Sequence, residues 1–261
     1  MNETTDNTGF RDQVCLITGA AGAIGSATAE AFAAQGASLF LVDRAAPEEL
    51  AERLRKSGAT VTAAAADVTR DADIRASVNA AMAAYGRIDI LVNVAGIVSQ
   101  GNAEDISEEE WDRVLGINLK GTFLFCRAVM PVMRRQQYGR IVNLGSVIAM
   151  NGGTSRPWLD REELRRSGNV AYGASKAGVH ALTGYLAKDL AGDGVTVNAV
   201  APGPIATSMT TRYPQSMMQL IPLGRMGRPE EVAHAILYLA SREAGFITGE
   251  VLDINGGLSV G

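Results

Sequence analysis

The chain has 261 residues, of which 47% are hydrophobic and 20% charged, and its formal net charge is −4. This composition is typical of a large soluble α/β domain, and the absence of a basic tract argues against nucleic acid as a partner. No apolar run approaches the roughly 20 residues of a membrane span. We therefore expect no membrane or nucleic-acid partner, and the two cysteines, interpreted below as free thiols, predict a cytoplasmic protein.

Short apolar runs alternate with longer helical patterns along the chain. The polar residues 1–12 indicate a flexible N-terminal tail, and residues 13–261 indicate a single domain. The predicted strands are mostly apolar throughout, as is typical of strands covered on both faces. Their alternation with helices predicts an α/β fold with a parallel, doubly wound sheet. The strands are predicted at residues 14–18, 38–42, 60–64, 88–93, 140–144, 195–200 and 250–253, and the helices at 24–35, 48–56, 72–85, 108–136, 171–191 and 229–240.

A glycine-rich loop joins the first predicted strand to the first helix. Gly19, Gly22, Ile24 and Gly25 follow the pattern G-x-x-x-G-x-G rather than the commoner G-x-G-x-x-G. Glycines let a backbone turn tightly and approach a pyrophosphate, whose charge the helix N-terminus stabilises. The alternative is a turn that binds nothing, but the position between strand and helix favours nucleotide binding.

Asp43 ends the second predicted strand, 18 residues after Gly25. A carboxylate there can accept hydrogen bonds from the adenosine ribose hydroxyls, and it would repel the 2′-phosphate of NADP. Arg44 could offset part of that repulsion, whereas Ala21 supplies no cation in the glycine loop. We therefore expect NAD, with NADP as the less favoured cofactor. The alternative for Asp43 is a capping or turn residue.

Polar and small residues follow the third and fourth predicted strands: Asp67 and Val68, then Asn93, Ala95 and Gly96. Ligands of open α/β sheets bind at these carboxyl ends of strands. Asp67 could accept from the adenine amino group, Asn93 could hold neighbouring strand ends together, and Gly96 would let the backbone approach the cofactor. A plain turn is the alternative for each of them.

Tyr172 and Lys176 lie four residues apart in a predicted helix. Residues at this spacing share one helix face, and a nearby positive charge favours the phenolate and lowers the tyrosine pKa. The pair is a candidate acid/base for exchange between an alcohol and a carbonyl. By itself the pattern also occurs on ordinary helix surfaces.

From about residue 13 to residue 257, the chain closely resembles the short-chain dehydrogenase/reductase family, in its compact branch of roughly 250 residues. The resemblance implies a Rossmann-like sheet of seven mainly parallel strands, a nicotinamide cofactor, a small-molecule substrate and a homotetramer. The matching motifs occur in the family's order: residues 18–25, Asp67, residues 93–96, Asn118, Ser146, Tyr172 with Lys176, Pro202 and Gly203 with Thr207, and Asp253 with Gly256 and Gly257.

The resemblance also implies a role for each catalytic residue. Tyr172 would exchange the proton with the substrate oxygen, and Ser146 would hydrogen-bond that oxygen. Lys176 would lower the tyrosine pKa and hold the nicotinamide ribose, so Tyr172 and Lys176 also contact the cofactor. Asn118 would position a water that continues the proton path.

Further along, the resemblance places Pro202 and Gly203 beside the nicotinamide, with Thr207 on its amide or phosphate region. Residues 205–221 would then form a substrate lid.

The chain departs from the family pattern at two places. Only Asn93 remains of the usual two asparagines after the fourth strand. Ser146 and Tyr172 are 26 residues apart, whereas about a dozen residues usually separate them. An insert therefore lies at about residues 150–169, beside the predicted site.

The insert has its own helix signals. Asp160 followed by Glu163 forms a capping-box pattern, which predicts a helix at residues 161–166. We hypothesise that the insert lines or covers the substrate site, where Trp158 could stack on a substrate and Arg156, or one of the helix arginines, could bind an anionic group. The alternative is a surface helix or a subunit contact.

The cysteines and histidines suggest neither a disulfide nor a metal site. We interpret Cys15 and Cys126, both in apolar stretches, as buried small hydrophobic residues. His180 and His234 lie on separate predicted helices. We interpret both histidines as residues of a helix surface or a subunit contact.

The leading hypothesis is an NAD-dependent oxidoreductase that interconverts a secondary alcohol, such as a polyol, a sugar or a small hydroxy compound, and its ketone. One alternative is a 3-oxoacyl thioester reductase. The net negative charge, Asp43 and the insert argue against it, because that reaction would favour NADPH and a basic docking patch. A second alternative is a catalytically silent, cofactor-binding regulator. The complete set of Asn118, Ser146, Tyr172 and Lys176 argues against that role.

Overall fold

The computed structural model describes residues 9–154, 156–207, 210 and 215–259, and its centre is a seven-stranded sheet. The strand order is β3-β2-β1-β4-β5-β6-β7, and every pairing is parallel. The predicted doubly wound sheet is therefore confirmed. The strands are β1 (Val14–Thr18), β2 (Ser38–Asp43), β3 (Val61–Ala65), β4 (Ile90–Asn93), β5 (Gly139–Leu144), β6 (Val195–Pro202) and β7 (Val251–Ile254).

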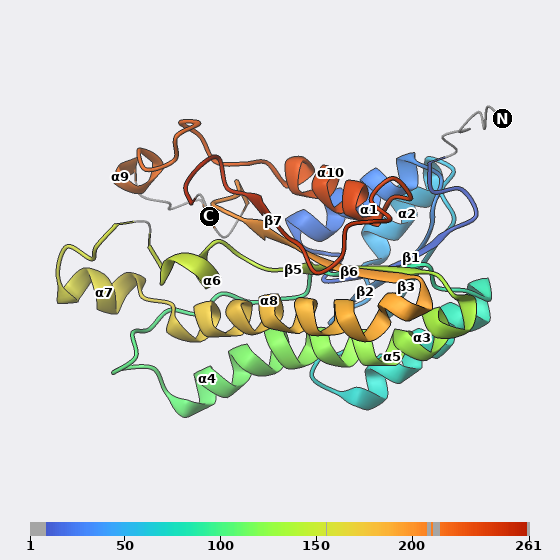
Figure 1. Ribbon diagram of the computed structural model, residues 1–261, viewed down its shortest axis with the longest axis horizontal. Helices are drawn as coiled ribbons and strands as arrows, with labels where there is room; N and C mark the ends of the chain where they lie inside the picture. The colour runs from blue at the N-terminus through green and yellow to red at the C-terminus, as the bar shows by residue number, and fades with distance from the viewer. Residues whose placement is uncertain (1–8, 155, 208–209, 211–214, 260–261) are drawn as a thin grey trace.

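Helices cover both faces of the sheet (Figure 1). One layer holds α1 (Ala23–Ala34), α2 (Glu48–Lys56) and α10 (Pro229–Ala240), and the other holds α3 (Asp71–Tyr85), α5 (Gly121–Gln136) and α8 (Val170–Leu190), with α4 (Glu108–Leu115) beside α8. The short helices α6 (Ile148–Asn151), α7 (Arg161–Ser167) and α9 (Gln215–Met218) lie toward one end of the molecule, on the left in Figure 1.

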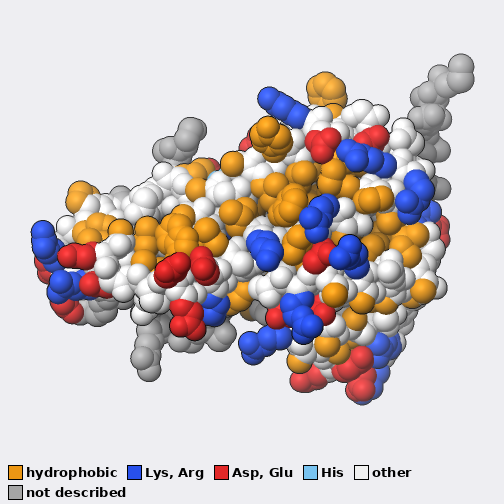
Figure 2. Space-filling view, turned by 90° about the horizontal axis from the view of Figure 1, so that it is seen from below, with side chains coloured by type: hydrophobic (Ala, Val, Ile, Leu, Met, Phe, Trp, Pro, Cys, Tyr) orange, Lys and Arg blue, Asp and Glu red, His pale blue; other side chains and the backbone are white. Residues whose placement is uncertain are grey.

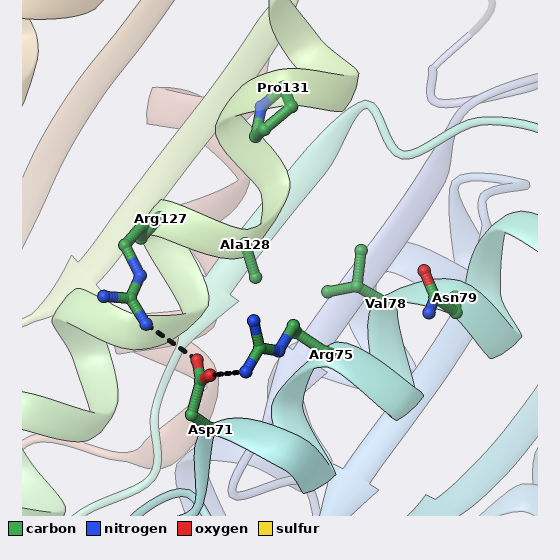
Figure 3. Close-up of a pocket in the computed structure, with 7 residues that line it drawn as sticks. All are labelled: Asp71, Arg75, Val78, Asn79, Arg127, Ala128 and Pro131. Carbon is green, nitrogen blue, oxygen red and sulfur yellow. Dashed lines mark hydrogen bonds and ion pairs between the residues drawn. The ribbon is translucent and has the colours of Figure 1, made fainter.

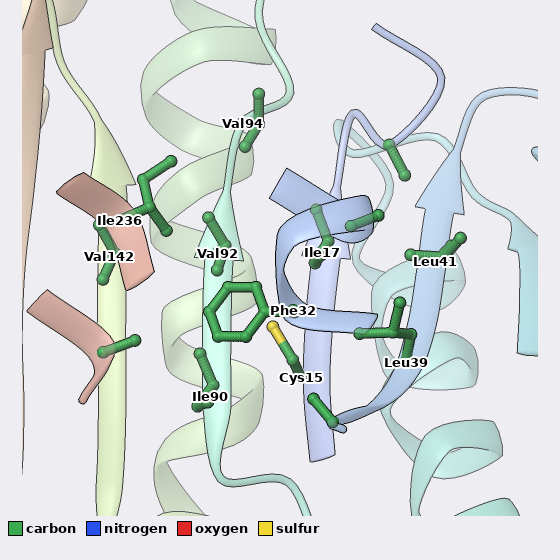
Figure 4. Packing of buried hydrophobic residues seen from close by; sticks show 14 of the residues in the cluster. Cys15, Ile17, Phe32, Leu39, Leu41, Ile90, Val92, Val94, Val142 and Ile236 are labelled. Atoms are coloured by element: carbon green, nitrogen blue, oxygen red, sulfur yellow. The ribbon is translucent and has the colours of Figure 1, made fainter. Parts of the chain in front are cut away.

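Alternation along each strand divides the buried residues into two cores. Cys15 and Ile17 point to the α1 and α10 side, where they pack with Phe32 and Ile236 (Figure 4). Leu16, between them in the sequence, belongs to the core on the α3 and α5 side. Because successive side chains of a strand point to opposite faces, a strand buried on both faces has to be apolar at every position. This explains the uninterrupted apolar runs in the sequence.

The structure differs from the prediction at two places. The helix predicted at 108–136 is interrupted by a π-helical turn, η1 (Gly116–Lys120), between α4 and α5. Residues 1–8 of the predicted tail lie outside the described residues. Residues 9–12 form a turn, in which Phe10 is buried and packs edge-on against Phe32 with ring centroids 4.7 Å apart.

Both cysteines are free and buried, Cys15 in β1 and Cys126 in α5. Within the described part of the chain, no helix combines the length and the apolar character needed to cross a bilayer.

Candidate active site

The glycine loop folds tightly between β1 and α1. Gly19 has a φ of 67°, and a Cβ there would lie 2.6 Å from the backbone nitrogen of Ala95. A Cβ on Gly25 would lie 2.1 Å from the carbonyl oxygen of Gly19. Gly22 is the exposed N-cap of α1 and has no such conflict, with Gly19 O at 3.4 Å. The loop therefore presents backbone N–H groups at an exposed helix start, a cradle that fits a dinucleotide pyrophosphate.

Asp43 lies directly beside this loop, as the last residue of β2. Its Oδ2 accepts a hydrogen bond from the Ala21 N–H at 2.9 Å, and its Oδ1 accepts one from the Arg44 N–H at 2.7 Å. The Arg44 side chain is exposed. The carboxylate is thus fixed at the edge of the glycine loop, and its contact to a ribose stays a prediction.

The residues after β3 and β4 lie at the same edge of the parallel sheet as the glycine loop. Asp67 Oδ1 accepts from both the hydroxyl and the N–H of Thr69, and these hydrogen bonds are the main reason that the pKa of Asp67 is lowered. Val68, the next residue, packs against the start of α5. Asn93 Nδ2 donates to Asn143 Oδ1 at 2.9 Å, so Asn93 does join two neighbouring strand ends. Its own Oδ1 is buried without a partner.

Asn118 lies in the π-helical turn and is fully buried. Its Oδ1 accepts from the Ile97 N–H at 2.8 Å, and its Nδ2 donates to the Ile97 carbonyl and to Ser175 Oγ. The side chain therefore clamps the backbone after β4. A Cβ on Gly96 would lie 3.3 Å from Asn118 Oδ1 and 3.5 Å from Lys176 Nζ, so the missing side chain at residue 96 leaves room for both groups.

Tyr172 and Lys176 lie on one face of α8, with Lys176 Nζ 5.8 Å from the centre of the Tyr172 ring. The Ser146 hydroxyl is hydrogen-bonded to Tyr172 and lowers its pKa, but burial has the larger effect and raises this pKa above its ordinary value. Burial therefore outweighs the lowering by Ser146, and the net effect is opposite to the lowering of the Tyr172 pKa that the sequence predicts. The structure brings together the predicted trio of serine, tyrosine and lysine.

Lys176 is 2% exposed, and its Nζ donates to the Leu144 carbonyl at 2.6 Å. Burial lowers the pKa of Lys176 to about 8. The side chain therefore changes charge close to neutral pH, and it fixes the end of β5 just before Ser146.

The end of β6 approaches the trio from the other side. Pro202 O accepts from the Val147 N–H at 3.1 Å, and a Cβ on Gly203 would lie 2.9 Å from Asn255 Cα. Thr207 follows, with its N–H donating to Thr210 Oγ1. The predicted lid at 205–221 lies partly outside the described residues, at 208–209 and 211–214.

The insert forms the expected helix, α7, with Asp160 as its N-cap accepting from the Glu163 N–H at 2.7 Å. Arg156 binds both oxygens of Glu163, at 3.0 and 2.7 Å, and the same carboxylate accepts from the Leu159 N–H. This guanidinium is therefore paired inside the insert, and its contact to a substrate stays a prediction. Trp158 is half-buried and lies beside Gly153.

The insert is also tied to the loop that follows β4. The N–H of Gly101 donates to the Gly168 carbonyl at 2.8 Å, and the Val170 N–H donates back to Gly101 O at 3.3 Å. Arg165 pairs with Asp105 at 3.4 Å. The insert and this loop are therefore joined to each other just before the start of α8, the helix that carries Tyr172.

His180 is a residue whose role the sequence interpretation missed. It is half-buried, and its Nε2 accepts from the Ser146 N–H at 3.3 Å. Its spacing was an available signal, because residue 180 lies one turn beyond Lys176 and two turns beyond Tyr172 on the same helix face. His234 lies on the surface of α10, as expected.

A hollow of about 580 Å³ lies elsewhere, between α3 and α5 (Figure 3). Asp71 pairs there with both Arg75 and Arg127. The hollow contains none of the residues that the sequence singled out. Its two arginines outnumber its one aspartate, and because it lies apart from those residues, we do not assign it to the active site.

The comparisons with known proteins cover almost the whole chain. A family model described as enoyl-(acyl carrier protein) reductase matches residues 19–259. The 3-oxoacyl-(acyl-carrier-protein) reductase FabG of Thermotoga maritima is 41% identical over 254 residues, which cover 95% of this chain and 98% of the relative. D-threitol dehydrogenase of Mycolicibacterium smegmatis is 39% identical over 255 residues, with coverage of 95% and 93%. The crystal structure of gox2181 is similar with a TM-score of 0.88 and 33% identity, covering 96% of this chain and 97% of that one.

Proposed function

This chain belongs to the short-chain dehydrogenase/reductase family of oxidoreductases, and we propose that it interconverts a 3-oxoacyl thioester and the corresponding 3-hydroxyacyl thioester with NAD(H). The observation that carries the reaction class is the cluster of Ser146, Tyr172 and Lys176 beside the glycine loop. The substrate class is supported by the 3-oxoacyl reductase among the relatives, at 41% identity.

In the proposed reaction, Tyr172 handles the proton at the substrate oxygen. During reduction its hydroxyl donates to the carbonyl oxygen, and during oxidation its phenolate takes the proton back. Ser146 hydrogen-bonds the same oxygen and orients the substrate. A bound nicotinamide supplies or accepts the hydride. A positioned acid/base of this kind contributes a rate factor of about 10²–10⁴.

Lys176 and Asn118 assist Tyr172 through charge and through hydrogen bonds. Positive charge on Lys176 favours the phenolate, and its hydrogen bond to Leu144 O fixes the strand end that carries Ser146. Asn118 is bonded to Ile97 and Ser175. We therefore propose that Asn118 holds the cofactor-side loop in place, in addition to the water-positioning role that the family resemblance implies.

The cofactor would lie along the carboxyl ends of the strands. Gly19, Gly22 and Gly25 with Ile24 would hold the pyrophosphate, and Asp43 with Arg44 the adenosine ribose. Further contacts would come from Asp67, Val68, Asn93, Ala95, Gly96, Pro202, Gly203 and Thr207. The fixed carboxylate of Asp43 supports NAD over NADP. Two buried thiols are compatible with a reducing cytoplasm.

The test is a turnover assay that follows the absorbance of reduced nicotinamide. Acetoacetyl-CoA with NADH is the probe for the thioester, and D-threitol, other polyols and small hydroxy acids with NAD⁺ probe the alternatives. We expect turnover of the thioester and a loss of about 10²–10⁴ in kcat for Tyr172→Phe. Tyr185→Phe, an exposed tyrosine on the same helix, is the matched control. Equal activity of the two variants would contradict the assignment of Tyr172.

A small polyol is the second candidate substrate, favoured by the 39% identity to D-threitol dehydrogenase. Turnover of polyols without turnover of acetoacetyl-CoA would replace the thioester in the proposal. Cofactor binding without turnover of any substrate would instead favour a regulatory protein.

A further inference from the structure

The backbone just before α6 leaves one N–H group in need of a partner. The N–H groups of Gly145 and Val147 donate to β6, at Val200 O (2.8 Å) and Pro202 O (3.1 Å). Alternate N–H groups of an extended chain point to opposite sides, so the Ser146 N–H points away from β6. A strand partner on that side is missing, because the pairing of β4 with β5 ends at Asn93.

His180 supplies the acceptor. Its Nε2 lies 3.3 Å from the Ser146 nitrogen, and Ser146 itself is only 5% exposed. A buried N–H without a partner costs about 1–3 kcal/mol. One turn earlier on α8, Lys176 donates to Leu144 O. Two side chains of one helix face therefore hold the carbonyl of residue 144 and the N–H of residue 146.

The contact with His180 also explains a glycine. A Cβ on Gly145 would lie 2.2 Å from His180 Nε2 and 2.7 Å from its Cδ2. The imidazole occupies the space where a side chain at residue 145 would be. The ring is therefore packed against the backbone at Gly145, next to Ser146.

The imidazole has to be neutral to accept this hydrogen bond, because its protonated form carries N–H on both ring nitrogens. Burial, followed by the charge of Lys176, lowers the pKa of His180 below its ordinary value. The strands beneath α8 carry one charged side chain, Arg140 on β5, and its guanidinium bonds the Ser241 and Gly139 carbonyls. The surroundings therefore favour the accepting form.

We infer that His180 is a positioning residue for the reaction proposed above: by accepting the Ser146 N–H, it holds the Ser146 hydroxyl in the orientation that meets Tyr172 and the substrate oxygen. It does not touch the reacting atoms. Its loss should slow the step that depends on orientation and leave cofactor binding intact.

The experiment compares three single variants with the wild type. His180→Leu has a similar size and no acceptor. His180→Gln restores an acceptor, because its Oε1 lies as many bonds from Cα as Nε2 of histidine. His234→Leu, on the exposed face of α10, is the control. We expect kcat for acetoacetyl-CoA to fall about 10–100-fold in His180→Leu. It should recover most of the way in His180→Gln and stay unchanged in His234→Leu, with the Kd for NADH equal in all four proteins.

Amide hydrogen exchange of the peptide that contains Ser146 provides a readout that needs no substrate. Exchange should be faster in His180→Leu than in wild type and close to wild type in His180→Gln. If the wild type turned over no substrate, the proposed function would fail, and this exchange measurement would still decide whether His180 holds Ser146.

Three results would overturn the inference. The first is a kcat in His180→Leu within about twofold of an active wild type. The second is an unchanged exchange rate at Ser146. The third is a loss in His180→Gln as large as in His180→Leu, since that would show a role other than hydrogen-bond acceptance. If His180→Leu does not fold, the His180→Gln variant and the exchange measurement test the inference in its place.

Discussion

At the scale of single residues, the pKa of Tyr172 should differ between the chain alone and the chain with bound oxidised nicotinamide. Burial raises the pKa of Tyr172, whereas burial lowers that of Lys176 to about 8. The phenol is therefore protonated at neutral pH, which suits a proton donor to a carbonyl. Lys176 keeps its positive charge below pH 8 or so, and it can favour the phenolate only there.

A titration can test this balance. Tyrosinate forms once the pH exceeds the tyrosine pKa, and a positive charge nearby lowers that pKa by about 1–3 units. Because oxidised nicotinamide is cationic, we expect saturating NAD⁺ to move the tyrosinate absorbance of one tyrosine to lower pH. Tyr172→Phe should lack the shift, and Tyr185→Phe should keep it. A shift of the same size in Tyr172→Phe would contradict the assignment.

Asp43 is the residue that tests the choice of cofactor. Replacing it with alanine removes the acceptor for the ribose hydroxyls and the negative charge that repels a 2′-phosphate. We expect the ratio of kcat/KM for NAD to that for NADP to fall about 10–100-fold, equivalent to about 1.4–2.7 kcal/mol. Asp12→Ala, an exposed aspartate before β1, is a control. An unchanged ratio in Asp43→Ala would remove the basis for NAD preference.

At the scale of elements, the two loop glycines nearest the start of α1 have different functions. A methyl group on Gly25 would collide with the Gly19 carbonyl at 2.1 Å, whereas one on Gly22 would find its nearest neighbour at 3.4 Å. Gly25 therefore allows the loop to pack closely against the start of α1. Gly22 leaves space on the exposed side of the turn, where we propose that the cofactor binds.

Thermal unfolding of two alanine variants should separate these functions. We expect Gly25→Ala to lower the Tm by several degrees, because 1 kcal/mol corresponds to about 2–4 °C in a chain of this size. Gly22→Ala should keep the Tm and weaken NAD binding. Equal Tm values for the two variants would show that the close approach at Gly25 is not needed for stability.

The sequence predicts the positions of the helices and strands better than it predicts the contacts between them. Apolar runs and turn signals located all seven strands within one or two residues, because burial on both faces leaves a continuous pattern. The capping signal of Asp160 and Glu163 located α7 for the same reason: its cause is local. The π-helical turn around Asn118 has no comparable signal, since the turn is set by packing between α4, α8 and the backbone after β4.

The same limit applies to side chains whose partners are distant in sequence. The order of Ser146, Tyr172 and Lys176 could be recognised, and the parallel sheet then brings them together. The sequence favours a helix surface or a subunit contact for His180, because its partner, the Ser146 N–H, is defined only once β5, β6 and α8 are assembled. The pairing of Arg156 with Glu163 could not be predicted either, because it depends on how the insert folds.

At the scale of the whole molecule, one face has the composition of an interface. Figure 2 looks onto the side formed by α4, α5 and α8, where hydrophobic side chains gather among charged ones. Tyr185 on α8 is 82% exposed, and Phe123 on α5 is 38% exposed beneath the guanidinium of Arg127. Exposed aromatic residues of this kind are typical of contact surfaces between subunits. They support the homotetramer that the family resemblance implies.

Charges introduced on this face should weaken assembly. We expect the double variant Phe123→Asp, Tyr185→Asp to shift the mass measured by light scattering toward dimers or monomers, since a charge in an apolar interface loses its hydration. Glu52→Lys on α2, on the opposite layer, changes the charge by two units and should leave the mass unchanged. A wild-type mass equal to one chain would refute the tetramer.

Several contacts that shape the insert between Ser146 and Tyr172 are local and lie within residues 156–163. The insert is tied to the loop after β4 through Asp105 and through Gly101, whose φ of 138° favours glycine. Such a segment could be moved between related proteins, because several of the contacts that shape it are formed within its own sequence. A relative that lacks it but carries a glycine and a carboxylate at the two docking positions could accept it by transplantation. On the hypothesis that the insert lines the substrate site, a substrate preference would then pass between enzymes as one contiguous piece of chain.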